Sequence, residues 1–190
     1  SIHVVMKLTI QIGKENKIAI IEDAAHALGA SYKKTPVGSI SDFTCFSFQA
    51  IKHITTGDGG AVACKNIEKS KEAKIKRWFG IDRENSKPSK LGERIFDIND
   101  LGYKYHMNDF PAALGLMNLQ GFKDRLTHRL KLAKIYKSSL SNIDGIELFN
   151  YKLDRQSSYW LFGFHVENRL SFIEALKSKG IIASVIHQGI

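Results

Sequence analysis

Apolar runs separated by turn-forming segments dominate the first third of the chain. Residues 17–23 contain a continuous apolar run that ends in two acidic residues, as a buried parallel strand does. Residues 42–48 and 60–64 form two further runs, with aromatic and β-branched residues that favour strands. Residues 55–60, Thr-Thr-Gly-Asp-Gly-Gly, separate the last two runs and have the composition of a tight turn. The pattern predicts three buried strands.

The middle of the chain carries helical signals. A helix is predicted over residues 67–79. Residues 80–100 are polar and show no clear period, so they are predicted to form a long loop of the kind that is usually functional or mobile. A second helix is predicted to begin near Asn108, because this residue type caps helices well. Apolar residues then recur at spacings of three and four between residues 126 and 140, which predicts an amphipathic helix.

The two ends of the chain differ in pattern. Residues 159–166 are predicted to form a strand and residues 170–179 a helix that stops at Gly180, with another strand over residues 181–186. Together these elements predict a small α+β lobe. At the other end, residues 1–5 have the pattern of the tail of a strand.

The composition is that of a globular protein. The chain has 190 residues, of which 43% are hydrophobic and 25% charged, enough for a core with a small second lobe. No run approaches the roughly 18 consecutive apolar residues that a membrane span needs, so we expect no membrane partner. Cys45 and Cys64 both lie in predicted strands, which favours free thiols and a cytoplasmic protein.

The net charge of +9 allows two explanations. A basic domain can bind nucleic acid. However, acidic residues interrupt the basic ones even in the densest stretch, residues 65–77, as on a solvated helix face. We therefore expect no nucleic-acid partner and interpret the charge as a general attraction for anionic substrates.

Four polar residues lie at or just beyond the ends of the predicted strands: Asp23, His26, Ser47 and Lys52. In open α/β sheets, ligands bind outside the carboxyl ends of the strands, so this placement predicts a site. Burial disfavours the charged form of a lysine, and a neutral amine is what Schiff-base chemistry requires. A carboxylate can keep a heterocyclic nitrogen protonated, and hydroxyls and backbone amides at a strand-to-turn junction suit a phosphate.

Each of these residues also has a structural explanation. Asp23 can end a strand or cap a following helix, His26 can lie on a helix surface, and Ser47 can fill the edge of the core between two phenylalanines. Lys52 can be a solvated surface lysine. The turn over residues 55–60 is no P-loop, because its glycines lack that spacing and Lys52 precedes them. Spacing alone leaves these explanations open.

Ordered motifs cover nearly the whole chain. They begin with Ile21-Glu-Asp-Ala-Ala-His-Ala-Leu-Gly-Ala30, Val37-Gly-Ser-Ile-Ser-Asp42 and Phe46-Ser-Phe-Gln-Ala-Ile-Lys-His-Ile-Thr-Thr-Gly-Asp-Gly-Gly60. Leu101-Gly-Tyr-Lys-Tyr-His-Met-Asn-Asp109 and Ala112-Ala-Leu-Gly115 follow. In order and separation these segments resemble the signatures of the DegT/DnrJ/EryC1/StrS aminotransferase family.

The resemblance implies an α/β fold of the fold-type-I pyridoxal-phosphate class. Residues 1–121 would be the C-terminal part of the large cofactor-binding domain, a mostly parallel sheet with flanking helices. Residues 122–190 would be part of the small α+β C-terminal domain. Family members use pyridoxal 5'-phosphate to transfer an amino group, usually from glutamate, to a keto group of a nucleotide-linked sugar. The resemblance thus implies a sugar aminotransferase with no metal site.

The resemblance also implies roles for individual residues. Lys52 would carry the cofactor as a Schiff base and move protons between substrate and cofactor. Asp23 would pair with the pyridinium nitrogen, and Ala25 would pack against one face of the ring. His26 would lie near the ring hydroxyl, and Ser47 would hold the phosphate.

Two features depart from the family pattern. Residues 102–107 would reach the cofactor of a neighbouring subunit in a homodimer, but Lys104 and His106 differ from the residues that many members carry there, so this contact stays unassigned. The family's N-terminal portion, with its first strands and a phosphate-binding loop, does not precede Ser1, and the C-terminal lobe is short. We therefore expect a fragment that is inactive alone.

Two other functions stay open as alternatives. Pyridoxal-phosphate sugar dehydratases of the same family carry a histidine in place of the Schiff-base lysine. Lys52 occupies this position here and His53 follows it, which disfavours dehydration. A non-catalytic, regulatory binding protein on the same scaffold is the third possibility, and no DNA-binding motif supports it.

Overall fold

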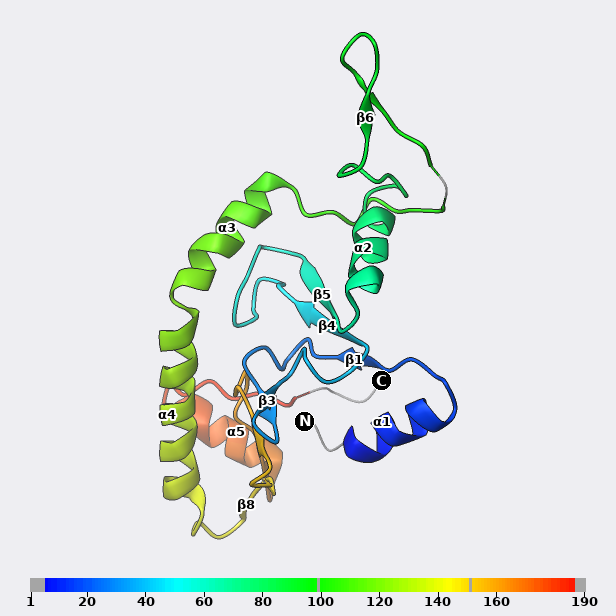
Figure 1. The fold of residues 1–190 in the computed structure, drawn as a ribbon. Helices are drawn as coiled ribbons and strands as arrows, with labels where there is room; N and C mark the ends of the chain where they lie inside the picture. Colours follow the sequence, from blue (N-terminus) through cyan, green and yellow to red (C-terminus); the bar gives the residue numbers. More distant parts are fainter. Residues whose placement is uncertain (1–5, 99, 151, 187–190) are drawn as a thin grey trace.

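The centre of the molecule is a three-stranded sheet with the order β1-β4-β5 (Figure 1). A computed structural model describes residues 6–98, 100–150 and 152–186. The sheet consists of β1 (Ile21–Asp23), β4 (Phe43–Ser47) and β5 (Gly60–Cys64). β1 runs parallel to β4, whereas β5 runs antiparallel to it. All three predicted strands are therefore present, in a sheet of mixed direction.

The first strand is shorter than predicted. The helix α1 (Met6–Glu15), which the sequence analysis did not predict, is closed by the amide of Ile18, which donates to the carbonyl oxygen of Gly13 at 2.8 Å. Lys17 adopts a φ of 55° in this turn, which no strand residue does. Residues 17–20 therefore finish the helix and lead into β1.

Two of the strands are less buried than predicted. Ile21 in β1 is 70% exposed and Val62 in β5 is 55% exposed. Because these residues lie on the same face of the sheet as Phe43 and Cys45 of β4, that face is open to solvent in the described part of the chain. The prediction of three buried strands was wrong for β1 and β5, and β4 is half-buried except at Thr44.

The opposite face of the sheet carries a small core. Phe46 packs against a cluster of buried residues, namely Ala24, Ala27 and Ala30 in the turns after β1, and Val37 directly after residue 36. Thr44, also on this face, is fully buried. The cluster fixes the turn that follows Asp23, and this turn positions the candidate site.

Three of the helices lie close to their predicted positions, although the first ends at Lys76, before its predicted end at residue 79. The helix α2 (Ile67–Lys76) begins after Asn66, whose side chain caps it, and lies beside β5. The helices α3 (Asp109–Gln120) and α4 (Phe122–Leu140) form a long arm along one side of the molecule (Figure 1). Asn108 caps α3 through its Oδ1, which accepts from the amide of Phe110. Within the described ranges, no helix is both long and apolar enough to cross a membrane.

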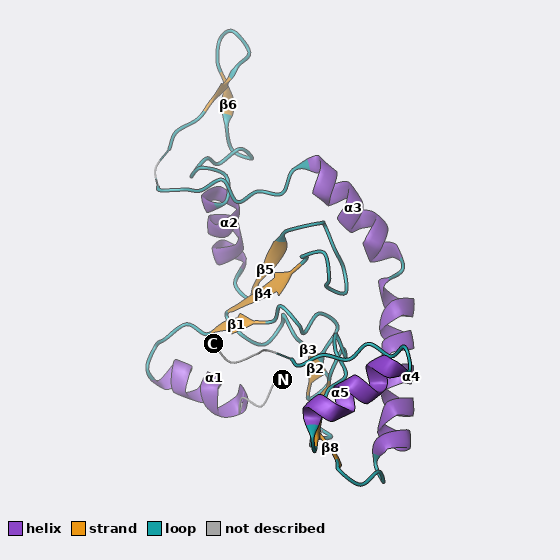
Figure 2. Ribbon diagram, turned by 180° about the vertical axis from the view of Figure 1, so that it is seen from behind, coloured by secondary structure: helices purple, strands orange, loops and turns teal. Residues whose placement is uncertain are grey.

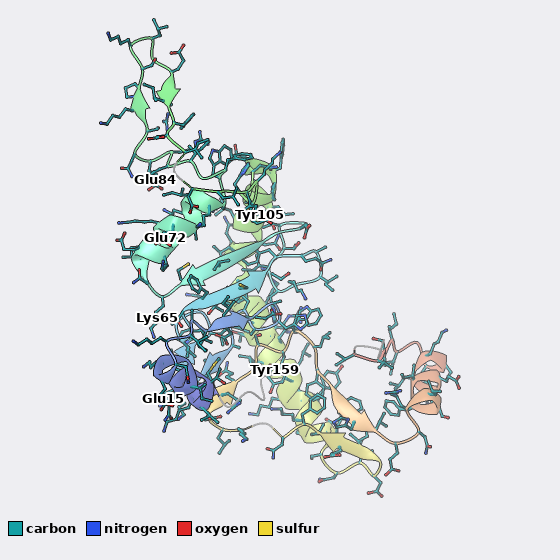
Figure 3. The ribbon with its side chains drawn as sticks, turned by 90° about the vertical axis from the view of Figure 1, so that its right-hand side faces the viewer. Glu15, Lys65, Glu72, Glu84, Tyr105 and Tyr159 are labelled. Atoms are coloured by element: carbon teal, nitrogen blue, oxygen red, sulfur yellow. The ribbon has the colours of Figure 1, made fainter. Side chains whose placement is uncertain are left out.

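The predicted long loop contains a short hairpin. The strands β6 (Lys87–Pro88) and β7 (Arg94–Ile95) pair antiparallel and extend beyond the end of α2 (Figure 2). The return segment crosses the end of α2 so closely that a Cβ on Gly102 would collide with the amide nitrogen of Gly80. Tyr105, which is labelled in Figure 3, belongs to the return segment, and its amide donates to the carbonyl oxygen of Arg77 at 2.9 Å.

The C-terminal lobe has fewer strand residues than predicted. It contains β8 (Ile146–Leu148), β10 (Phe164–Val166), which pairs antiparallel with β8, and α5 (Arg169–Ser178). Residues 159–163 and 181–186 are not strands. The amide of Ile181 donates to the carbonyl oxygen of Leu176, so Ile181 closes the end of α5 and does not begin a strand.

A small sheet joins the lobe to the first part of the chain. The strand β2 (Ser31–Tyr32) lies between β3 (Thr35–Pro36) and β9 (Arg155–Gln156), and both pairings are antiparallel. This pairing brings the residues that follow β9 next to the turns after β1 and β4. The proposed division of the chain at residues 121 and 122 falls at Gly121, between α3 and α4.

Candidate functional site

Asp23 and Ser47 lie on one face of the sheet. Asp23 pairs with Cys45 in the parallel β1–β4 ladder, and Ser47 follows two residues later on the same face. An open pocket of about 440 Å³ lies here, lined by Ile21, Asp23, Ala25, Cys45, Phe46 and Ser47. The structure thus brings together three of the five predicted site residues at the carboxyl ends of the parallel strands.

Asp23 is exposed and keeps hydrogen-bonding capacity for a ligand. Its Oδ1 accepts from the amide of Ala25 at 3.0 Å, while the amide of Ala24 donates to the carbonyl oxygen of Cys45 at 2.8 Å. Asp23 therefore caps a turn, as its structural explanation requires, but this bond uses only one of the two carboxylate oxygens. The residues after Asp23 form turns, and no helix begins at Ala24.

Ser47 begins the turn that follows β4. Its Oγ accepts from the amide of Gln49 at 3.3 Å, so the hydroxyl hydrogen is still available to donate. On the partner strand, a Cβ at Gly60 would collide with the carbonyl oxygen of Phe46. The close approach of the two strands at Gly60 therefore requires glycine, and it fixes the backbone beside Ser47.

Lys52 lies in the loop between β4 and β5. The loop is closed at its base by the amide of Phe48, which donates to the carbonyl oxygen of Gly59 at 2.8 Å, and by the amide of Thr56, which donates back to Phe48 at 2.9 Å. The amide of Lys52 itself donates to the carbonyl oxygen of Gln49. The lysine is half-buried, and its Nζ lies 4.0 Å from the ring centroid of Trp160.

His26 contacts the same indole. The rings of His26 and Trp160 stack with 3.9 Å between their centroids and an angle of 24° between their planes. His26 and Lys52, which are predicted to serve one cofactor, thus meet at a residue that the sequence analysis did not select. Trp160 lies beyond a boundary between predicted domains, and no local pattern marks it.

His53 is a second residue that the sequence analysis did not place in the site. It is 7% exposed, and its Nε2 lies 3.0 Å from the carbonyl oxygen of Ser158. Because a carbonyl oxygen only accepts, Nε2 carries the hydrogen. Burial lowers the pKa of His53, although the hydrogen bond to Ser158 opposes this effect, and the positive charges of Arg129 and Lys52 lower it further.

The segment with Lys104 and His106 packs against α2 of its own chain. The amide of Tyr103 donates to the carbonyl oxygen of Lys76 at 2.7 Å, and the ring of His106 lies 3.7 Å from that of Trp78, edge to face. Met107 then approaches the loop of Lys52, since its Cε would lie 3.2 Å from a Cβ on Gly59. The segment therefore borders the site on this side.

The comparison with protein families agrees with this arrangement. The model of the DegT/DnrJ/EryC1/StrS aminotransferase family matches residues 3–190. The chain belongs to this family.

Relatives of the family match most of this chain. An uncharacterized protein of Methanocaldococcus jannaschii is 38% identical over 93% of the chain and 47% of its own length. A UDP-4-amino-4,6-dideoxy-N-acetyl-beta-L-altrosamine transaminase of Campylobacter jejuni is 32% identical over 94% of the chain and 45% of its own length. The chain thus spans about half the length of the curated relatives it matches.

Solved structures of the family share the fold. AtS13 from Actinomadura melliaura has a TM-score of 0.86 at 34% identity, and the match covers 97% of this chain and 50% of AtS13. The sugar aminotransferase CalS13 from Micromonospora echinospora has a TM-score of 0.80 at 30% identity, over 92% of this chain and 46% of CalS13. These matches show that the mixed α/β architecture is part of the fold-type-I large domain with part of the small lobe.

The residues of this chain fit the family's cofactor. The pocket on the sheet combines an exposed carboxylate at Asp23, a small side chain at Ala25 and a hydroxyl at Ser47, and its opening leaves room for an aromatic ring. A protonated ring nitrogen, a ring face and a phosphate require these three groups. No group of three or more metal-ligating side chains occurs among residues 6–98, 100–150 and 152–186.

Proposed function

We propose that this chain is part of a pyridoxal-phosphate-dependent aminotransferase that transfers an amino group to a keto group of a nucleotide-linked sugar. The observation that carries the proposal is that Asp23, Ala25 and Ser47 line one pocket, in a chain of this family. Lys52 lies in the loop that directly follows the strand of Ser47.

The names of the relatives support the substrate class. The transaminase of Campylobacter jejuni is named for a UDP-linked sugar, and a relative from Shewanella sediminis, 36% identical over 71% of this chain, is named a UDP-4-amino-4-deoxy-L-arabinose–oxoglutarate aminotransferase. Oxoglutarate is the keto acid that glutamate becomes when it gives up its amino group, so we propose glutamate as the donor. The net charge of +9 favours an anionic substrate such as a nucleotide sugar.

The structures of Spr1654 from Streptococcus pneumoniae support the cofactor. This protein was solved in PLP, PMP and apo forms, and the PLP form has a TM-score of 0.79 at 29% identity over 95% of this chain. When bound, pyridoxal phosphate supplies an electron sink for the carbon that loses a proton.

The residues of this chain would serve this chemistry in different ways. Asp23 would keep a proton on the ring nitrogen, and Ala25 would pack against the ring. Ser47 would donate its hydroxyl hydrogen to the phosphate, and His26 would lie near the ring hydroxyl. Lys52 would hold the cofactor and act as an acid and base at the reacting carbon.

Two observations support the proposed assembly and compartment. The helix α3 exposes apolar side chains, among them Phe110 at 89% and Met117 at 67%, as a surface between two subunits of a homodimer would. Cys45 and Cys64 are both free thiols, which fits a reducing cytoplasm.

The alternatives have less support. A sugar dehydratase of the family would need a histidine in place of Lys52, and the adjacent histidine, His53, is buried against the carbonyl oxygen of Ser158. A regulatory protein without catalysis would need a ligand pocket but no lysine in the loop that follows Ser47.

Chemical trapping tests the assignment of Lys52. The complete protein is loaded with pyridoxal phosphate and reduced with borohydride, and its peptides are mapped by mass spectrometry. The pyridoxyl adduct is expected on the peptide that contains Lys52. An adduct on Lys33, Lys34 or Lys65 instead would refute the assignment.

A further inference from the structure

Trp160 contacts two of the predicted cofactor residues, His26 and Lys52, and the backbone of the residue before Lys52. Its indole stacks on His26, and the Nζ of Lys52 lies 4.0 Å from its ring centroid. Its Nε1 donates to the carbonyl oxygen of Ile51 at 2.8 Å. Residues 51 and 160 are 109 positions apart, so this bond is a tertiary contact and not a local turn.

The neighbours of Trp160 hold the same loop. The carbonyl oxygen of Ser158 accepts from His53 at 3.0 Å, so residues 158 and 160 contact three consecutive residues of the loop. Through these contacts the C-terminal lobe holds the backbone on both sides of Lys52 as well as its side chain.

The segment that carries Trp160 is itself held in place. Nη1 of Arg129, on α4, donates to the carbonyl oxygens of Tyr159 at 3.2 Å and Trp160 at 3.1 Å. Tyr159 has a φ of 47°, a left-handed conformation that is costly for a residue with a side chain and persists only where the surroundings enforce it. Tyr159 lies between the central sheet and the C-terminal lobe (Figure 3). Such a fixed segment gives the indole a defined position.

We propose that Trp160 is a positioning residue for Lys52. Its ring face holds the protonated side chain of Lys52 in one place until the amine loses its proton and bonds to the cofactor, and its Nε1–H fixes the loop through Ile51. A lysine side chain otherwise samples many rotamers, and a cation over an indole face is attracted to one place. The proposal deepens the proposed function and rests on Lys52 being the cofactor lysine.

The first test measures how fast the amine is captured. The apo form of the complete protein is mixed with pyridoxal phosphate, and covalent binding is followed by absorbance above the protein bands. Trp160→Leu is expected to slow capture roughly tenfold, because ring and N–H are both lost. Trp160→Phe is expected to restore part of the rate, to within about threefold of the wild type, because a ring face remains.

A matched control separates positioning from general packing in the lobe. Phe172 packs edge to face on Phe164 within the C-terminal lobe. Phe172→Leu is expected to lower thermal stability while leaving the capture rate at the wild-type value. Equal capture rates for the wild type and Trp160→Leu would overturn the proposal. It would also be overturned if Phe172→Leu slowed capture as much as Trp160→Leu does.

The second test needs neither cofactor nor a folded Trp160 variant. The 190 residues of this chain contain two tryptophans, so Trp78→Phe, combined with replacement of any tryptophan outside these residues, leaves Trp160 as the only indole. In this background, Lys52→Met is expected to change the fluorescence of Trp160 in the apoprotein, since it removes a charge from the ring face. Lys34→Met is the control and is expected to leave the spectrum unchanged. An unchanged spectrum for Lys52→Met would contradict the contact.

The two tests distinguish failure of this proposal from failure of the proposed function. An adduct that maps to a lysine other than Lys52 refutes the assignment of Lys52 in the proposed function, whatever the fluorescence shows. An adduct on Lys52 together with capture rates that do not respond to Trp160 refutes only the positioning role.

Discussion

Among single residues, Asp23 combines a structural contact with a place in the candidate site. One carboxylate oxygen caps the turn after β1, and the side chain borders the open pocket. If Asp23 only capped the turn, asparagine could replace it, because the side-chain oxygen of asparagine also accepts a hydrogen bond. A residue that keeps a ring nitrogen protonated needs the negative charge.

Asp23→Asn is therefore expected to reduce turnover strongly and cofactor affinity only modestly. The charge acts mainly in the transition state, where the loss is on the order of several kcal/mol in the barrier. The measurement is kcat together with the dissociation constant for pyridoxal phosphate. Asp42→Asn is the control, because Asp42 accepts from the amide of Ile20 at the other end of the sheet. Near-normal turnover in Asp23→Asn would show that the residue is only a cap.

Ser47 permits a test that isolates one part of the cofactor. A charge-assisted hydrogen bond to a phosphate contributes about 1.5–3 kcal/mol. Ser47→Ala is thus expected to weaken the binding of pyridoxal phosphate at least tenfold, and to leave the binding of pyridoxal, which has no phosphate, unchanged. Titration with both compounds makes the comparison. Equal weakening of both would assign Ser47 to the structure of the turn.

At the level of elements, the loop between β4 and β5 depends on a buried neutral histidine. Burial is the main reason that the pKa of His53 is lowered, with Arg129 and Lys52 adding to it. In the unfolded chain the pKa returns to about 6.5. Below that pH the unfolded state binds more protons at this residue than the folded state, so this residue's contribution to stability is lost as the pH falls.

His53→Gln is expected to make the stability of the protein less sensitive to acid. Glutamine can donate to the carbonyl oxygen of Ser158 as Nε2 does, but it does not titrate. Urea unfolding at pH 7.5 and pH 5.5 gives the free energy of unfolding for both proteins. The wild type is expected to lose more stability than the variant between these pH values. A parallel loss in both would show that His53 does not contribute to the acid sensitivity.

For the whole molecule, the proposed homodimer makes α3 the element to alter. Its exposed apolar residues Phe110 and Met117 would be covered by the second subunit. We expect a dimer by light scattering at micromolar concentration, and we expect Phe110→Glu combined with Met117→Glu to give monomers. Leu170→Glu is the control, since Leu170 is also exposed but lies on α5. A wild-type monomer that binds pyridoxal phosphate would contradict a site to which residues 102–107 of the second subunit contribute.

The sequence alone determined the elements that depend on neighbouring residues. The runs of β4 and β5, the helix starts at Ile67 and near Asn108 and the helix stop at Gly180 follow from local propensity and capping, which act within a few residues. The motifs also indicated the family, because their order and spacing can be read without coordinates.

Only the tertiary structure decided which residues surround Lys52. The direction of β5, the open face of the sheet and the end of α1 at Lys17 depend on how the chain closes on itself. The contacts of Trp160 and His53 join segments more than one hundred residues apart, and no local pattern predicts such a pairing. These contacts are made by the ring face of Trp160 and the carbonyl oxygen of Ser158, which the tertiary fold brings to the loop of Lys52. Neither group has a signature in the residues next to it.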